Sequence, residues 1–447
     1  MVYLYITLVI FVAFIIFQSM YILIPLFKKE NRHKIKRNYS FSVLVPAFNE
    51  GKVISQCISG FQQLNYSAAE LIIINDGSTD DTLAILKQKL KLLPYKYYSM
   101  SAKLKHNHII KVYESSIFPN IYVIDKLQGG KADALNAGIN FSVNEVVITL
   151  DADSILDQNS LLEMNAAFQD FDTIACGGNV LIAQAFNGEM DNLKPTFKIS
   201  GIIRYQFLQY LTAFYLHKRA QASLRTISVI AGAFGAFRKE VLVDINGFRN
   251  TIGEDMDITL KLHLWIKDNG GHKRISFVPT AMCYTECPTT LIDLFKQRVR
   301  WQKAFIDCLI YYRRFYFVRL SKRFSIFFLL DQFIIGTLNA FPVVLMPLLL
   351  IFHKGHYILF LLFGTSAVLL FMYQSITTIY VSSVHGIKFS KVDIFRILLF
   401  LPIEIFVFRL VNLSFVIYGT LTYFYQPQKW NKVERSGDLD KMNVKIT

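Results

Sequence analysis

Apolar residues gather at both ends of the chain, and shorter apolar runs alternate with polar ones between them. Residues 2–27 carry no charge and exceed the roughly 20 residues that a spanning helix needs. They lack the basic start and small-residue cleavage site of a signal peptide, so we predict a retained anchor at 1–27. Three apolar segments long enough to span a bilayer follow later, at 324–352, 356–382 and about 394–425.

The later apolar segments contain ionisable residues, which are costly at membrane depth. Asp331 lies in the first segment, and Arg396, Glu404 and Arg409 lie in the last. We expect these side chains to face protein, water or the membrane interface. Within the predicted region of transmembrane and interfacial helices at 316–425, one or more segments could therefore begin as an interfacial helix.

Charge indicates how the chain crosses the membrane. A juxtamembrane linker at 28–40 follows the anchor and is strongly basic, and such clusters stay on the cytoplasmic side. We therefore expect the N-terminus outside and the following region inside. The polar tail at 426–447 also favours the cytoplasm, whereas one plus three spans would place it outside. A break in the last apolar segment is one way to resolve this conflict.

The region from 41 to 315 predicts one α/β domain with a mostly parallel sheet, because short apolar runs alternate with helical patterns. Three of its four predicted strands end in an aspartate. Ligands of open parallel sheets bind beyond the carboxyl ends of the strands, so these aspartates should converge on one crevice. The predicted strands are 41–46, 71–76, 121–125 and 146–151.

Two stretches of this domain are less regular. A basic, tyrosine-rich connection at 86–120 is longer than a usual loop, and we predict extra helix or flexible surface there, without chemistry. An aromatic-rich stretch at 195–222 predicts a long amphipathic helix. It could belong to the domain or lie against the bilayer surface.

Composition narrows the class of protein and its partners. A hydrophobic content of 53% is too high for an ordinary soluble enzyme of 447 residues. The formal charge is +15, but the basic residues gather beside apolar segments and no base-reading motif accompanies them. We therefore exclude nucleic acid and expect anionic lipid and a phosphorylated substrate as partners. The five cysteines lie in the part expected in the cytoplasm, so no disulfide framework is predicted.

The motif "NDGSTDDT" at 75–82 follows a predicted strand. Gly77 permits a tight turn, and Ser78 with Asp81 has the spacing of a capping box, so a turn and helix cap are expected. That structural interpretation leaves Asp76 without a role. Its carboxylate could accept hydrogen bonds from a ribose or a base.

The motif "DAD" places Asp151 and Asp153 directly after a fully apolar strand. Two carboxylates one residue apart can reach a hard cation that also takes phosphate oxygens. Capping of the next helix is the structural alternative. In this setting we favour metal binding.

Two later motifs could complete a site. Glu254 and Asp255 begin a predicted helix, where the helix dipole alone favours acidic residues. In "KQRVRW", Gln297, Arg300 and Trp301 have the spacing of one helical face and offer an amide, a cation and a flat apolar plate. Such a face suits a sugar beside a diphosphate, although a basic helix at the membrane surface is the simpler interpretation.

Taken in order, these motifs resemble those of a known family. "VPAFNE", "NDGSTDDT", "GGKADALN", "DAD", "GEDMD" and "QRVRW" are similar to the motif set of the membrane-embedded family 2 glycosyltransferases, the cellulose, hyaluronan and poly-N-acetylglucosamine synthases. The Q-x-x-R-W match is specific to the processive branch. The segment 217–242, "GGKADALNAGI" and the single anchor look most similar to bacterial poly-β-1,6-N-acetylglucosamine synthases. The insertion at 86–120 and "GEDMDIT" depart from their pattern, which leaves the sugar and linkage open.

The resemblance implies a GT-A fold in a cytosolic domain, with α-helical transmembrane segments. It also implies Mg²⁺ or Mn²⁺ as cofactor and a role for each matched residue. Uridine would be held by Pro46, Ala47, Asn49, Glu50 and Asp76. The diphosphate would be held by Lys131 and by a metal on Asp151 and Asp153, the base would be Asp255, and the acceptor end would lie at Gln297, Arg300 and Trp301.

The resulting hypothesis is an inverting, processive synthase in a bacterial plasma membrane. It would polymerise a UDP-sugar, with UDP-N-acetylglucosamine preferred, and feed the growing β-linked polysaccharide across the bilayer, with or without a small accessory membrane subunit. The alternatives are transfer of one sugar to a lipid carrier and a hyaluronan- or glucan-type synthase. A non-enzymatic scaffold is disfavoured because every expected carboxylate is present.

Overall fold

The computed structural model describes residues 2–28, 34–96, 103–344, 357–426 and 442–443. The chain forms two compact units, each described by itself below. The sheet unit comprises Glu30–Leu193, Ser228–Cys287 and Glu434–Thr447. The helical unit comprises Met1–Lys29, Lys194–Ile227 and Pro288–Val433.

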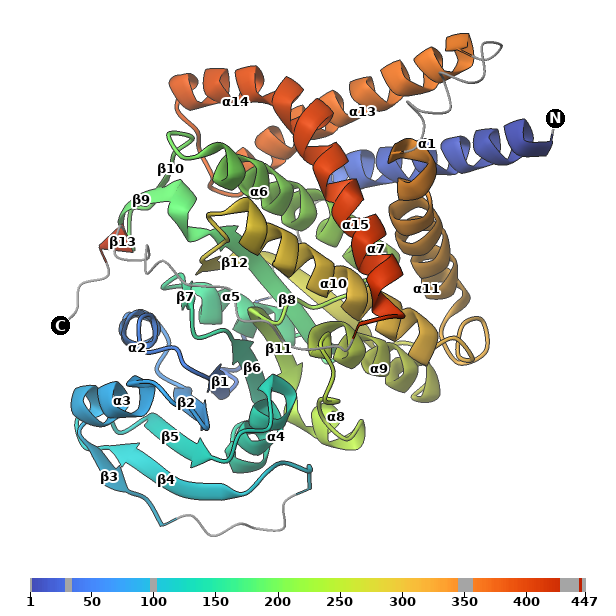
Figure 1. The fold of residues 1–447 in the computed structure, drawn as a ribbon. Coiled ribbons are helices and arrows are strands. Elements are labelled where there is room, and N and C mark those ends of the chain that lie inside the picture. Colours follow the sequence, from blue (N-terminus) through green and yellow to red (C-terminus); the bar gives the residue numbers. More distant parts are fainter. Residues whose placement is uncertain (1, 29–33, 97–102, 345–356, 427–441, 444–447) are drawn as a thin grey trace. The chain divides into compact units, whose positions relative to one another are not determined.

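The sheet unit is built on a ten-stranded mixed sheet with the strand order β3-β4-β5-β2-β1-β6-β11-β8-β12-β7 (Figure 1). Its central strands β5, β2, β1 and β6 run parallel, and antiparallel strands flank them on both sides. The strands of the unit are β1 (Phe41–Ala47), β2 (Ala69–Asp76), β3 (Leu92–Pro94), β4 (Ile109–Ser115), β5 (Ile121–Lys126), β6 (Val146–Leu150), β7 (Ser154–Leu156), β8 (Thr173–Ile182), β9 (Phe186–Glu189), β11 (Phe234–Arg238), β12 (Arg274–Thr285) and β13 (Met442–Asn443).

Helices connect and cover these strands. α4 packs closely on β1 and β2 because Gly138 has no side chain. A Cβ atom at this position would lie only 3.0–3.1 Å from side-chain atoms of Leu44 and Ile74. All five cysteines are free and buried. The helices are α2 (Ile54–Gln62), α3 (Thr82–Leu90), α4 (Lys131–Phe141), α5 (Ser160–Phe168), η1 (Ala183–Ala185), α8 (Lys239–Asp244) and α9 (Glu254–Asp268).

The four predicted strands are confirmed, and they form the parallel centre of the sheet. β6 is buried along its whole length, which explains its unbroken apolar sequence. The prediction of extra helix within 86–120 was wrong. After α3 this connection forms β3 and β4, an antiparallel pair that joins the sheet beside β5. Residues 97–102 within it lie outside the described residues.

The helical unit contains the long apolar segments of the chain. Within the described ranges, three helices are long and apolar enough to cross a membrane, namely Leu8–Phe27, Lys322–Val344 and Gly364–Val384. Its elements are α1 (Val2–Phe27), β10 (Lys194–Pro195), α6 (Gly201–Leu211), η2 (Thr212–Lys218), α7 (Arg219–Leu224), α10 (Leu291–Tyr311), α11 (Lys322–Phe327), η3 (Phe328–Leu338), α13 (Tyr357–Val384), α14 (Lys391–Ile403), η4 (Glu404–Phe408) and α15 (Arg409–Tyr423).

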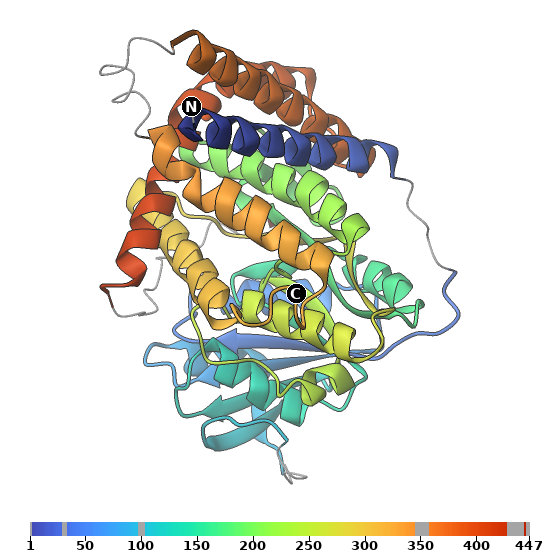
Figure 2. The same ribbon diagram turned by 90° about the vertical axis from the view of Figure 1, so that its right-hand side faces the viewer.

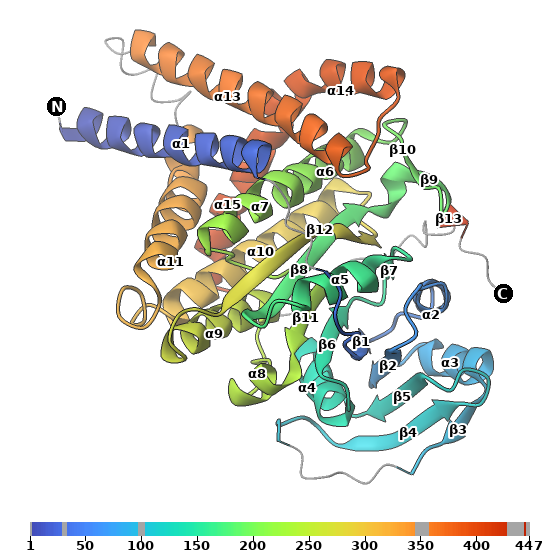
Figure 3. The same ribbon diagram turned by 180° about the vertical axis from the view of Figure 1, so that it is seen from behind.

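The anchor α1 is integrated into this unit through specific contacts. Figures 2 and 3 show α1 running beside α13, and the rings of Phe14 and Phe371 meet edge to face at 5.8 Å. Tyr21 donates a 2.5 Å hydrogen bond to Asp331, which is buried. The Gln374 amide lies 2.9 Å from Gln18 of α1. α1 therefore forms part of a packed bundle through polar as well as apolar contacts.

The last apolar segment is broken. The predicted span at about 394–425 instead forms α14 and α15, separated by the π-helical segment η4, and the chain changes direction between them (Figure 1). Pro402 stands at the end of α14, where its ring removes a backbone donor and disrupts the helix. The ionisable residues of this segment face protein partners, since Arg396 pairs with Asp393 at 3.0 Å and Arg409 pairs with Glu404 at 2.9 Å.

Candidate active site

The loops that follow β1 and β2 are tied together at the carboxyl end of the sheet. Asn49 has a φ of 57°, a conformation that asparagine tolerates better than most residues. Its side-chain oxygen accepts a 2.7 Å hydrogen bond from the backbone of Thr79, and its own backbone N–H donates to Ser78 at 2.9 Å. Glu50 donates through its backbone to Thr82 at 2.9 Å. The "PAFNE" and "NDGSTDDT" motifs therefore form one connected surface.

Asp76 lies at the end of β2 as predicted, but its carboxylate is used within the protein. Lys126, at the end of β5, places its ammonium 2.6 Å from Asp76 and 2.5 Å from Asp133. The backbone N–H groups of Gly129 and Gly130 donate to the two Asp76 oxygens at 3.0 and 2.7 Å. Asp76 thus fixes the glycine loop that leads into α4, and its role in holding uridine stays a prediction.

 Charged side chains from three motifs, "GGKADALN", "DAD" and "GEDMD", form a cluster around Lys131 at the carboxyl end of the sheet. The Lys131 ammonium, at the start of α4, lies 2.6 Å from Asp151 and 3.1 Å from Glu254. Although burial opposes its charge, these carboxylates hold the pKa of Lys131 above its ordinary value. The predicted residues Lys131, Asp151 and Asp255 are therefore brought together, and Glu254 joins them.

Asp255 is the member of the cluster best suited to exchange a proton. Burial raises its pKa to about 6, and the neighbouring Glu254 carboxylate adds to the effect while Lys131 opposes it. The backbone N–H groups of Met256 and Gly232 donate hydrogen bonds to its carboxylate. A carboxylate held in this way is ionised at neutral pH and still a usable base.

The residues of the "DAD" motif fit a divalent cation that draws further ligands from a substrate. Asp153 is buried, and the hydroxyls of Ser154 and Thr285 lie 3.3 and 3.5 Å from one of its oxygens. Among the residues that the structure describes, no group of three His, Cys, Asp or Glu side chains is placed to hold a metal ion. Proteins commonly bind Mg²⁺ with only one or two carboxylates plus phosphate oxygens, and the pair of Asp151 and Asp153 meets that requirement.

The third predicted group, on α10, belongs to the helical unit and is described there alone. Gln297 is buried, whereas Trp301 is 39% exposed. The guanidinium of Arg298 lies 4.4 Å from the Trp301 ring centre, so Arg298 stacks on the tryptophan. The helical face expected for Gln297, Arg300 and Trp301 exists, but its roles remain predictions.

Sequence reasoning missed several residues that shape this site. Lys126 and Asp133 were not singled out, because Lys126 precedes the "GGKADALN" motif and Asp133, although within it, was given no role. Gly232 was also missed, and a side chain there would lie 2.9 Å from the Lys131 ammonium. One signal for Lys126 was available: it directly follows the predicted strand 121–125, and the predicted strand 71–76, which pairs with it, ends in Asp76.

Comparison with known families identifies the protein class. A family model described as "Glycosyl transferase family 2" matches residues 42–245, and one described as "Glycosyl transferase family group 2" matches residues 146–381, more than half of the chain. The chain belongs to glycosyl transferase family 2. The resemblance inferred from the motifs is thereby confirmed, and the protein is a glycosyltransferase.

Individual proteins agree with this assignment. The glycosyltransferase is 31% identical over 330 residues to a poly-beta-1,6-N-acetyl-D-glucosamine synthase of Staphylococcus aureus (strain COL), covering 71% of this chain and 69% of the relative. A synthase of the same name from Staphylococcus epidermidis is 30% identical over 294 residues, covering 65% and 60%. A mannosyltransferase structure from Pyrobaculum calidifontis, in complex with GDP-Man and Mn²⁺, covers 94% of this chain and 97% of its own with a TM-score of 0.59. At 13% identity, that likeness shows the GT-A fold alone.

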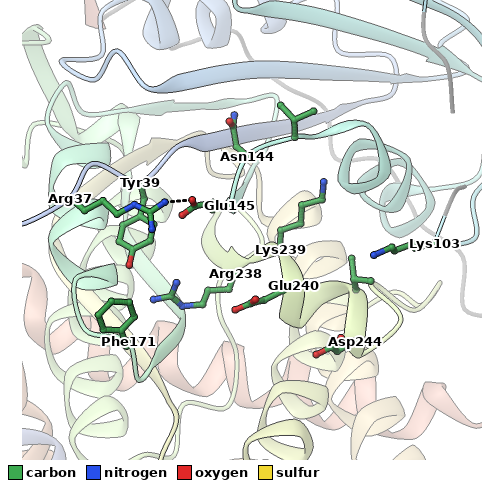
Figure 4. Close-up of a pocket in the computed structure, with 12 residues that line it drawn as sticks. Arg37, Tyr39, Lys103, Asn144, Glu145, Phe171, Arg238, Lys239, Glu240 and Asp244 are labelled. Atoms are coloured by element: carbon green, nitrogen blue, oxygen red, sulfur yellow. Dashed lines mark hydrogen bonds and ion pairs between the residues drawn. The ribbon is translucent and has the colours of Figure 1, made fainter. Parts of the chain in front are cut away.

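The glycosyltransferase also has a cavity of about 480 Å³ at the other end of its sheet (Figure 4). Arg37 and Tyr39, which precede β1, line it together with Glu145, which precedes β6. Arg37 pairs with Glu145, and the guanidinium groups of Arg37 and Arg238 lie 5.0 and 5.3 Å from the Tyr39 ring centre. None of the residues assigned above to catalysis lines this cavity, so it is separate from the candidate active site.

The buried position of Lys126 predicts a large effect on stability. Replacing Lys126 by Met leaves Asp76 and Asp133 without their shared cation, and such a change typically costs about 3–5 kcal/mol. We expect a clear fall in the thermal unfolding temperature of the purified full-length glycosyltransferase. Lys111→Met, on the exposed side of β4, is the control with the same change of charge.

A double variant tests whether the ion pair is the cause. Lys126→Met combined with Asp76→Asn should lose less stability than the sum of the two single variants, because Asp76→Asn removes one of the two carboxylates that Lys126→Met leaves unpaired. Equal unfolding temperatures for Lys126→Met and the wild type would contradict the assignment.

Proposed function

We propose that this glycosyltransferase polymerises N-acetylglucosamine from UDP-N-acetylglucosamine into a β-linked polysaccharide at a membrane. The observation that carries the proposal is the cluster of Asp151, Glu254 and Asp255 around Lys131. The names of relatives at 30–31% identity support the choice of sugar and product. The spanning-length helices support the membrane location.

The reaction requires a base at the acceptor hydroxyl, and Asp255 is proposed for that role. Its carboxylate takes the hydroxyl proton while the acceptor oxygen bonds to the anomeric carbon of the donor. The bond from that carbon to the diphosphate breaks, and UDP leaves with the electron pair. One direct displacement inverts the anomeric centre, so an α-linked donor gives a β-linked product.

The leaving diphosphate carries most of the developing charge. Asp151 and Asp153 would hold Mg²⁺ or Mn²⁺, which when bound supplies electrostatic stabilisation to that charge. Lys131 can add its ammonium from the start of α4. The loop bearing Pro46, Ala47, Asn49 and Glu50, with Asp76, is proposed to hold the uridine.

The helical unit is proposed to hold the growing chain. In the described part of this unit, two buried guanidinium nitrogens of Arg298 have no hydrogen-bond partner. One buried side-chain oxygen also lacks a partner in each of four further residues, Gln206, Gln209, Gln297 and Glu404. Sugar hydroxyls both donate and accept hydrogen bonds, so a polysaccharide can satisfy both kinds of group. These buried groups, with the Trp301 plate, support a processive enzyme over one that transfers a single sugar.

The broken last segment supports a membrane topology that satisfies the charge of the tail. With three spans and an outer N-terminus, the sheet unit and the C-terminal tail both lie in the cytoplasm, and α14 with α15 lies at the interface. This arrangement removes the conflict that four spans create.

Labelling of introduced cysteines tests this topology. In intact cells, a membrane-impermeant maleimide should label Val2→Cys and leave Ser436→Cys unlabelled until the cells are permeabilised. The five native cysteines are buried and provide little background. Labelling of Ser436→Cys in intact cells would place the tail outside and overturn the three-span topology.

Incubation of the full-length enzyme with each UDP-sugar tests the donor and the product. We expect long N-acetylhexosamine chains from UDP-N-acetylglucosamine alone, measured by mass spectrometry together with UDP release. EDTA should abolish the activity, and Mg²⁺ or Mn²⁺ should restore it. Asp255→Asn should lower the rate by about 10² or more, since it removes the base.

Asp268→Asn, at the exposed far end of α9, is the matched control and should retain activity. Long chains from another donor would refute the choice of sugar. A product carrying one added sugar would refute processivity.

The raised pKa of Asp255 predicts a pH dependence. Because the base must be ionised, kcat/KM should rise with pH through about 6 and then level off. Glu254→Gln removes a carboxylate that raises this pKa, so its acidic limb should move to lower pH. Glu240→Gln, an exposed position with the same change of charge, should leave the limb in place. A limb that stays fixed or moves to higher pH in Glu254→Gln would exclude Asp255 as the titrating base.

A further inference from the structure

One cation contacts the carboxylates of the candidate active site on two sides. The Lys131 ammonium bonds Asp151 at 2.6 Å, on the loop after β6, and Glu254 at 3.1 Å, at the start of α9. Asp255 also acts on its charge. The Lys131 side chain is only 22% exposed, so water screens these interactions weakly.

Among the interactions that the structure describes, the carboxylates of this cluster outnumber its cations. Lys131 contributes one positive charge, whereas Asp151, Asp153, Glu254 and Asp255 contribute four negative charges when ionised. Such a cluster attracts a divalent cation strongly, and Lys131 already bonds one oxygen of Asp151. A lysine and a metal ion on the same carboxylate repel each other, so they compete for Asp151.

We propose that Lys131 is an internal counter-ion that keeps the divalent cation off Asp151 until the sugar nucleotide arrives. The proposal rests on the proposed function, in which Asp151 and Asp153 hold the metal on a diphosphate. The diphosphate offers the Lys131 ammonium a new anionic partner, and its flexible four-carbon stem allows the ammonium to move. Release of Asp151 and binding of the metal then occur together.

This exchange makes metal and nucleotide bind cooperatively. Metal alone must displace Lys131 from Asp151 and leave it with Glu254 as its remaining bonded carboxylate, so the metal binds weakly. Metal with the diphosphate allows Lys131 to change partners, so each ligand raises the affinity for the other. The cation therefore enters the site mainly as part of the donor complex.

Mn²⁺ binding to the full-length protein in detergent, without nucleotide, tests the proposal directly. Titration followed by electron paramagnetic resonance of free Mn²⁺ should show about tenfold or more tighter binding to Lys131→Met than to the wild type, because the competing charge is removed. Lys131→Arg retains the charge and should bind Mn²⁺ as weakly as the wild type. Lys111→Met is the control for net charge and should also match the wild type.

A second variant moves the ammonium without changing any charge. A methyl group in Gly232→Ala would lie 2.9 Å from the Lys131 ammonium and would displace it. Mn²⁺ should again bind more tightly than to the wild type. Thermal unfolding of each variant verifies that the protein is folded.

UDP measures the coupling. Saturating UDP should tighten Mn²⁺ binding to the wild type far more than to Lys131→Met, in which no ammonium changes partners. Mn²⁺ affinities of Lys131→Met and Gly232→Ala at or below that of the wild type would overturn the proposal. Asp151→Asn should weaken Mn²⁺ binding in both the wild-type and Lys131→Met backgrounds, and an unchanged affinity would overturn it as well.

These measurements use no sugar and no turnover. A negative result here leaves the polymer assay unaffected, and an unexpected polymer product leaves the Mn²⁺ result standing. The two proposals can therefore fail independently.

Discussion

Carboxylates that must stand close together repel one another, and the sheet unit is arranged to hold them against that repulsion. Asp151 and Asp153 follow β6, which is buried along its length and gives them a rigid base. Glu254 and Asp255 occupy the first turn of α9, where the helix dipole favours negative charge. Lys131 bonds one member of each group, Asp151 and Glu254, and so joins the two groups.

A second lysine in the sheet unit also holds two carboxylates close together. Asp76 and Asp133 share Lys126, and the backbone of the glycine loop donates to the Asp76 oxygens. That loop leads directly into α4, whose first residue is Lys131. The buried ion pair between Lys126 and Asp76 thus fixes the loop that places Lys131 at the start of α4.

The helical unit has a different difficulty, because its polar side chains lie among apolar helices and need hydrogen-bond or ion-pair partners there. Asp331 accepts from Tyr21, and Glu404 pairs with Arg409. Several of the buried groups without a partner in the described part of this unit lie on α6, α10 and η4. A protein that retains such groups gains something other than stability from them, because each unsatisfied buried group costs free energy.

The sequence predicted those features that depend on neighbouring residues. The four parallel strands were found because each is a short apolar run, and the Asp151 pair was found because it ends such a run. The partner of Asp76 was not, because Lys126 is 50 residues away and only the pairing of β2 with β5 brings them together. β3 and β4 were missed for the same reason, since their strand character comes from pairing beside β5. The break between α14 and α15 had a local signal in Pro402, which the long apolar run concealed.

The strand β3 protects one side of the sheet from other molecules. It is the outermost strand on that side and contains only Leu92, Leu93 and Pro94. Proline has no backbone N–H to offer, and so short a strand cannot support an extended ladder. The edge therefore offers a second copy of this chain few backbone groups with which to continue the sheet.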